Sequence, residues 1–106
     1  MKKTITGTLS ESFQNLLIND FGKSMVITFI SLVNKGSNDT TFNIYKSVDN
    51  RKNRFYLNVV DAILSPGDLF FSDDEIVLGV NEMLILDVSN LNFIDYTVNY
   101  TEEDAP

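Results

Sequence analysis

The chain has 106 residues, a net charge of −7 and no His, Cys or Trp, which suits a single domain with one core. Without Cys there is no disulfide framework or thiolate metal site, and without His there is no Ser-His-Asp triad, so we expect a protein that is not an enzyme. The negative charge argues against a nucleic acid as the partner, because binding to phosphates needs a basic patch.

The first twenty residues predict one strand and leave a second element open. Met1–Thr6 has the charges of a signal peptide but no apolar stretch behind them, and its Thr-Ile-Thr alternation predicts a strand in a soluble, unprocessed protein. In Ser10–Asp20, Phe13, Leu16 and Leu17 have the i, i+3, i+4 spacing of a helix. A single helical turn, an irregular connection and a strand all fit this short stretch.

The longest apolar run, Met25–Val33, predicts a central strand that is covered on both faces. It is too short to span a bilayer, so we expect no membrane association. If the residues alternate strictly, one face carries Met25, Ile27, Phe29 and Val33, and the other carries Val26, Ile30 and Leu32.

Short apolar segments separated by turn residues continue to the end of the chain and are typical of an all-β protein. The expected strands are Ile5–Leu9, Met25–Val33, Thr41–Tyr45, Phe55–Val60, Ile63–Leu64, Leu69–Phe71, Ile76–Leu78, Met83–Val88 and Phe93–Tyr100. In the last of these, Ile94, Tyr96, Val98 and Tyr100 should face the core. We predict a single antiparallel β-sandwich over residues 1–100, of the jelly-roll or Ig-like kind, with about eight short strands. Residues 101–106 read as an acidic disordered tail.

The charges are divided unevenly along the sequence. All eight Lys and Arg residues but only four of the fifteen acids lie in the first 60 residues, so that part carries +4 and the remainder −11. One interpretation is that the two halves interleave in a single sandwich. The other is head-to-tail electrostatic complementarity between identical subunits.

Four acids, Asp68, Asp73, Asp74 and Glu75, are the best candidates for a metal site, because Ca²⁺ binds clusters of carboxylate and carbonyl oxygens. Their spacing does not match an EF-hand loop. The alternative is a solvated turn whose charges keep a sheet edge from pairing with another chain. Apart from Ca²⁺ at this cluster, we expect no cofactor.

Aromatic residues provide the other candidate surfaces. If Tyr45 and Tyr56 are half-exposed, they could stack on a sugar ring, although Trp is the usual platform for sugars. Phe70 and Phe71 are adjacent in a strand and must point to opposite faces, so one of them is available to another chain. Together with Val26, Ile30 and Leu32, they form the predicted subunit interface. A charged residue at Phe70 or Phe71 should unfold the domain or break assembly.

The order of these segments resembles the second half of small β-sandwich virion proteins of tailed bacteriophages. The similarity covers residues 24–100 and depends on strand and turn motifs at Arg54–Val60, Leu64–Asp68, Ile76–Leu78, Asn81–Leu84 and Ile94–Val98. Asn81-Glu82 departs from the family, which often has Gly-Glu or Gly-Asp there.

The resemblance implies a structural protein without catalytic residues that is made in the host cytoplasm and located in the virion. It implies capsid decoration or a head or tail accessory role, with capsid, collar or tail subunits as partners. Such proteins are usually homo-oligomers, often trimers. The alternative function from the residues alone is a glycan-binding or adhesin-type β-sandwich module.

Overall fold

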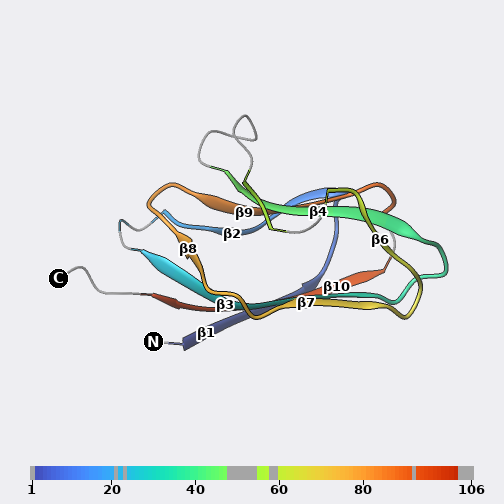
Figure 1. Cartoon of the computed structure of the whole chain (residues 1–106), viewed down its shortest axis with the longest axis horizontal. Coiled ribbons are helices and arrows are strands. Elements are labelled where there is room, and N and C mark those ends of the chain that lie inside the picture. The colour runs from blue at the N-terminus through green and yellow to red at the C-terminus, as the bar shows by residue number, and fades with distance from the viewer. Residues whose placement is uncertain are drawn as a thin grey trace.

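Ten β-strands and no helix make up the described part of the chain in the computed structural model (Figure 1). The description covers residues 2–20, 22, 24–47, 55–57, 60–91 and 93–102. Within it, no helix could cross a membrane. The strands are β1 (Lys2–Thr8), β2 (Phe13–Ile18), β3 (Met25–Asn34), β4 (Thr40–Ser47), β5 (Phe55–Tyr56), β6 (Ala62–Leu64), β7 (Leu69–Ser72), β8 (Ile76–Leu78), β9 (Met83–Val88) and β10 (Ile94–Glu102).

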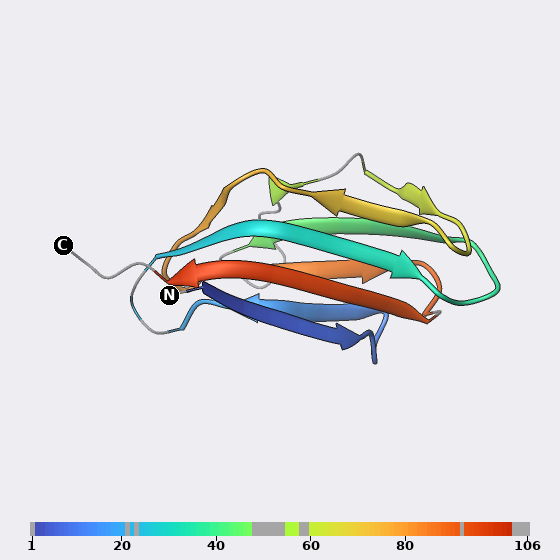
Figure 2. The ribbon, with the colours of Figure 1, turned by 90° about the horizontal axis from the view of Figure 1, so that it is seen from below.

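The strands form two antiparallel sheets that pack face to face (Figures 1 and 2). Sheet A has the order β1-β10-β3, with β7 and β8 both paired to the far side of β3. Sheet B has the order β2-β9-β4, with β5 and β6 both paired to the far side of β4. The all-β sandwich prediction is therefore confirmed, and the ten strands occupy eight positions.

The pairing is nested, because the chain folds back on itself. Strand β1 pairs with β10, β2 with β9, β3 with β7 and β8, and β4 with β5 and β6. The contacts β10–β3 and β9–β4 then complete the sheets. This is the jelly-roll arrangement, so of the two predicted sandwich types the chain has the first.

The nested pairing brings the basic and acidic parts of the sequence together, as the interleaving interpretation predicts. Three ion pairs join a lysine of the first half to an acid of the second: Lys3–Glu102 at 2.6 Å, Lys35–Asp95 at 3.1 Å and Lys46–Glu82 at 3.6 Å. Part of the charge difference along the chain is thus compensated within one subunit.

A β-bulge divides β3 into two parts with opposite alternation. Asn99 of β10 lies opposite Phe29, but the next residue, Tyr100, lies opposite Ile27, so Thr28 is an extra residue without a partner. As a result Ile27 and Ile30 both face the core. The strict alternation predicted from the sequence is therefore wrong beyond Thr28.

Strand β2 contains a second bulge, between Asn15 and Leu17. Its consequence is that Leu16 and Leu17 are both buried although they are adjacent. Leu16 and Leu17 follow Phe13 by three and four residues, so the bulge gives this strand the same spacing of apolar residues as a helix. Of the three possibilities left open for this stretch, the strand is the one that forms.

The last strand extends beyond the predicted end of the domain. Thr101 pairs with Lys2 on one side and Val26 on the other, and Glu102 forms the ion pair with Lys3. The predicted disordered tail is therefore wrong for these two residues, because each has a partner strand available. Residues 103–106 lie outside the described part.

Two buried asparagines form side-chain hydrogen bonds at opposite ends of the sandwich. The Asn34 amide donates to the carbonyl oxygens of Asn38 and Leu64, both at 2.9 Å, and its Oδ1 accepts from the Gly36 N–H at 2.9 Å. The Asn19 amide donates to the carbonyl oxygens of Leu78 at 2.9 Å and Gly79 at 3.0 Å. Each side chain thus ties a strand end to a turn from the other half of the chain.

The turn held by Asn19 contains Asn81, the position at which the resemblance described above implies a glycine. Asn81 has a φ of +67°, and its N–H donates to the Asn19 carbonyl at 2.8 Å. This left-handed conformation favours glycine, and Asn is among the residues that tolerate it best. Asn81 therefore preserves the backbone shape that a glycine would give.

Candidate interaction surface

The five predicted interface residues are divided between the core and the surface. Ile30 and Leu32 are 1% and 0% exposed, so they belong to the core and cannot line an interface. Their placement on an outer face was wrong because of the Thr28 bulge. Phe70 also faces inward, with its ring centroid 5.0 Å from that of Phe42.

The remaining two predicted residues, Val26 and Phe71, lie on the outer face of sheet A among other apolar side chains. The set, which we call the apolar strip, follows β3, β7 and β8 and comprises Val26, Phe29, Val33, Leu69, Phe71 and Val77. Cross-strand pairs make the strip continuous: Val26 lies opposite Val77 and Val33 opposite Leu69. Phe29 and Val33 were not predicted to lie here, because strict alternation along β3 places them on the same face as Ile27.

The centre of the strip is an aromatic pair. The Phe29 and Phe71 rings are stacked, with centroids 6.4 Å apart and planes inclined by 23°. Phe71 is 58% exposed, and Leu69 and Val77 are exposed to a similar degree. An apolar patch of roughly a few hundred Å² on one face of a small protein commonly marks an interaction site.

The other half of the same face is polar. Strands β1 and β10 present a row of hydroxyl and amide side chains, Thr4, Thr6, Thr8, Thr97, Asn99 and Thr101. Some of these side chains bond to each other across the strands, as in the hydrogen bond from Thr4 to Asn99 Oδ1 at 2.9 Å. The apolar strip therefore has a polar border, which is the usual arrangement of an interface core beside its rim.

The tyrosine pair proposed for sugar stacking is not available in this structure. Tyr45 is 0% exposed, so its predicted half-exposure is wrong. Its ring contacts Phe13 edge-on, with centroids 6.3 Å apart, and Tyr56 at 5.4 Å. Tyr45 therefore packs inside the aromatic cluster and offers no face on which a sugar could stack.

The acidic residues considered for Ca²⁺ are separated by a strand. Asp68 precedes β7, and its Oδ2 accepts the Ser65 N–H at 3.0 Å, closing a turn in which Gly67 has the predicted positive φ of +84°. Asp73, Asp74 and Glu75 follow β7 on its other end and are exposed. Among the described residues, no three acidic side chains are grouped closely enough to hold a metal ion.

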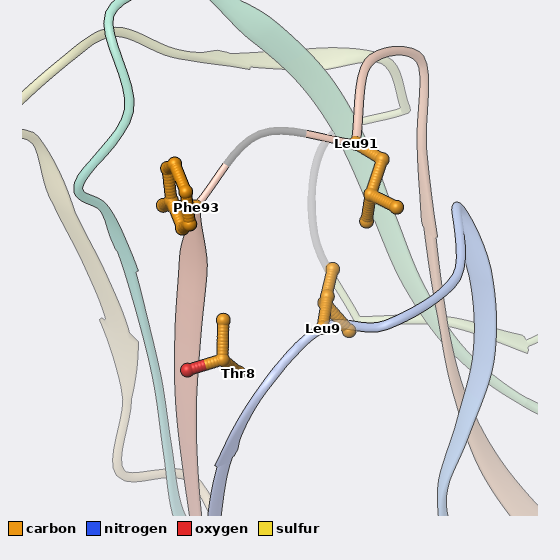
Figure 3. Close-up of a pocket in the computed structure, with 4 residues that line it drawn as sticks. All are labelled: Thr8, Leu9, Leu91 and Phe93. Carbon is orange, nitrogen blue, oxygen red and sulfur yellow. The ribbon is translucent and has the colours of Figure 1, made fainter.

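A small apolar hollow lies where β1 leads to β2 and β9 leads to β10 (Figure 3). It has a volume of about 250 Å³, and its described lining residues are Thr8, Leu9, Leu91 and Phe93. None of these side chains ionises or binds metals, and Phe93 is 69% exposed. The hollow can receive an apolar group, but the residues described around it offer no catalytic chemistry.

Thr8 also forms a hydrogen bond with the carboxylate of Asp95. Its hydroxyl donates to Asp95 Oδ1 at 2.6 Å, and Lys35 Nζ lies 3.1 Å from Oδ2. Both contacts favour the charged form and hold the pKa of Asp95 below its ordinary value of 3.8, and the hydrogen bond from Thr8 is the largest single cause.

We expect Thr8→Ala to raise the pKa of Asp95 toward 3.8, measured by NMR titration of the side-chain carboxyl, and Lys35→Ala to raise it as well. Because folding depresses this pKa, the associated stabilisation is present at neutral pH and is lost as the pH falls through the folded-state value. An unchanged pKa in Thr8→Ala would show that the hydrogen bond does not persist in solution.

No model of a known protein family matches the chain, and no curated protein matches it. The fold and the apolar strip are therefore the features of the molecule that bear on its function.

Proposed function

We propose that this protein is a non-enzymatic structural subunit of a bacteriophage virion, a capsid decoration or head or tail accessory component. It binds another virion subunit through the apolar strip. The strip is the observation that carries the proposal, because three of its residues are exposed and three are half-buried in one copy of the chain, and all six are suited to burial against a partner. Jelly rolls are frequent in viral capsid proteins, which agrees with the sequence resemblance.

The strip has the composition of an interface core, in which aromatic side chains such as Phe are enriched and charged side chains are depleted. Phe29 and Phe71 hold each other in one orientation, so little side-chain entropy is lost when a partner covers them. The aliphatic residues on either side can exclude water around this aromatic centre. A glycan-binding function loses its main support, since Tyr45 is buried and cannot stack on a sugar.

The test compares charge substitutions inside and outside the strip. Phe71→Asp places a charge at its centre, and Thr97→Asp places the same charge on the polar half of the same face. Because Phe71 is largely exposed, Phe71→Asp should cost only about 1 kcal/mol of stability, which a thermal melt will show.

The binding assay uses virions of the phage that encodes the chain, prepared without this protein. Added wild-type protein and Thr97→Asp should sediment with these particles, while Phe71→Asp should bind at least about tenfold more weakly, the loss expected when a hot-spot side chain is replaced. Mass spectrometry of complete virions should detect the protein. Its absence from virions, or equal binding by Phe71→Asp, would contradict the proposal.

A further inference from the structure

The four outer edges of the two sheets differ in how they are protected against pairing with other chains. Strand β2 is bulged, β5 and β6 have two and three residues, and β7 and β8 have four and three with the acids Asp73–Glu75 between them. Short strands, bulges and charges are the usual means of blocking an edge. These three edges are therefore poor sites for adding a strand.

Strand β1 is the exception. It has seven residues and pairs with β10 in unbroken register, from Lys2 opposite Thr101 to Thr8 opposite Asp95. Among the described residues, no strand lies on its other side (Figure 2). Its only charges are Lys2 and Lys3 at one end, so the centre of the edge is regular and uncharged.

The backbone groups on this open edge can be assigned. The N–H of Leu9, the residue after β1, donates to the Ile94 carbonyl at 2.9 Å, which makes this a hydrogen-bonded pair. Hydrogen-bonded and non-bonded pairs alternate along an antiparallel ladder. Lys3, Ile5 and Gly7 therefore direct their N–H and C=O groups to β10. The corresponding groups of Lys2, Thr4, Thr6 and Thr8 point to the open edge.

We propose that β1 pairs antiparallel with β1 of a second copy of this chain, across a twofold axis at Ile5. This register makes every outward-pointing backbone group of the strand part of a pair: Thr4 faces the partner's Thr6, and Lys2 faces the partner's Thr8. Threonine pairs of this kind stabilise antiparallel strands. The interface is separate from the apolar strip, and the proposal does not depend on the virion function.

The charges and the packing of the side chains favour this register over the one with Lys3 on the twofold axis. A shift toward the N-terminus that places Lys3 on the axis would bring the two Lys3 side chains together. With Ile5 on the axis, exposed Lys2 instead approaches the partner's Asp95, which lies next to the partner's Thr8. Ile5 is only partly buried in one copy, and its side chain would meet the partner's Ile5 and become covered. A twofold contact of this kind is the commonest form of self-association.

The first test removes one backbone N–H on the open edge and keeps the hydrogen bonds between β1 and β10. Thr6→Pro takes away an N–H that points to the open edge, and proline is tolerated on the solvent side of an edge strand. Thr6→Ala keeps the N–H and is the matched control. In analytical ultracentrifugation we expect wild type and Thr6→Ala at twice the 12.0 kDa of one chain, and folded Thr6→Pro as a monomer.

The second test uses the absence of cysteine from the chain. In the proposed dimer, Ile5→Cys brings two thiols together at a non-hydrogen-bonded pair, where Cα atoms are about 4.5 Å apart and a disulfide can form. Thr6→Cys is the control, because its two copies lie diagonally at about 7–8 Å or more. Mild oxidation should give a covalent dimer of Ile5→Cys several times faster than of Thr6→Cys.

Other results would overturn this proposal. These are a wild-type monomer across a wide concentration range, a dimer unaffected by Thr6→Pro, a ring or filament formed by pairing of β1 with the β7–β8 edge, or equal cross-linking of the two cysteine variants. Phe71→Asp separates the two proposals: it should dimerise like wild type even where it fails to bind particles.

Discussion

Replacing Ile30 by Asp is expected to unfold the domain, whereas the same replacement one residue earlier, at Phe29, should leave it folded. Ile30 is 1% exposed in the apolar core, with no cation described beside it. An unpaired carboxylate there costs several kcal/mol, a large part of the roughly 5–15 kcal/mol that stabilises a domain. Phe29 lies in the apolar strip, so Phe29→Asp loses mainly its stacking on Phe71, about 1 kcal/mol.

Chemical denaturation followed by circular dichroism measures both variants. The pair of substitutions also tests the bulge at Thr28, because strict alternation would place Phe29 on the same face as the buried Ile27. If Phe29→Asp unfolds and Ile30→Asp does not, the bulge is absent and the apolar strip must be redrawn without Phe29 and Val33.

The second large loss of folding stability is expected for a substitution at Asn34. Asn34→Asp keeps the shape of the side chain but replaces the amide that donates to the Asn38 and Leu64 carbonyls. At neutral pH the substituted carboxylate would be buried against two carbonyl oxygens and could donate to neither of them. We expect a loss of about 2–4 kcal/mol, because two buried hydrogen bonds are lost and a buried polar group left facing other acceptors costs about 1–3 kcal/mol.

The matched control is Asn15→Asp, which makes the same chemical change at an exposed position of β2. Its stability should remain within about 0.5 kcal/mol of wild type, as for most surface substitutions. Urea unfolding of the three proteins gives the comparison directly. A stability of Asn34→Asp equal to that of Asn15→Asp would show that the Asn34 hydrogen bonds do not hold the end of the sandwich.

Alternation predicted the strands well wherever their registers are unbroken. In β10, Ile94, Tyr96, Val98 and Tyr100 face the core as expected, because the extra residue of the β10–β3 bulge lies in β3 and seven residues of β1 pair with β10 without a shift. The all-β class and the turn at Gly67 were also predictable, since apolar periodicity and turn residues depend on nearby sequence alone.

The bulges could not be predicted, because each is defined by a count of residues on the neighbouring strand. If Thr28 is omitted, β3 alternates perfectly from Met25 to Asn34, yet nothing within β3 marks Thr28 as the extra residue. The same limit explains the interface prediction: Phe70 and Phe71 do point to opposite faces, whereas Ile30 and Leu32 were assigned to the wrong face. Burial of Tyr45 depends on contacts with Phe13 and Tyr56, which are distant in sequence.

The position of the apolar strip relative to β1 has a consequence for binding strength. A twofold axis at Ile5 that is perpendicular to sheet A turns the two copies of this sheet toward the same side. The two strips then form a bivalent surface, and attachment of the first raises the effective concentration of the second. A lattice that repeats its subunits at the matching spacing would retain the dimer much longer than an isolated subunit would, so selectivity for an assembled particle could arise from two individually weak contacts.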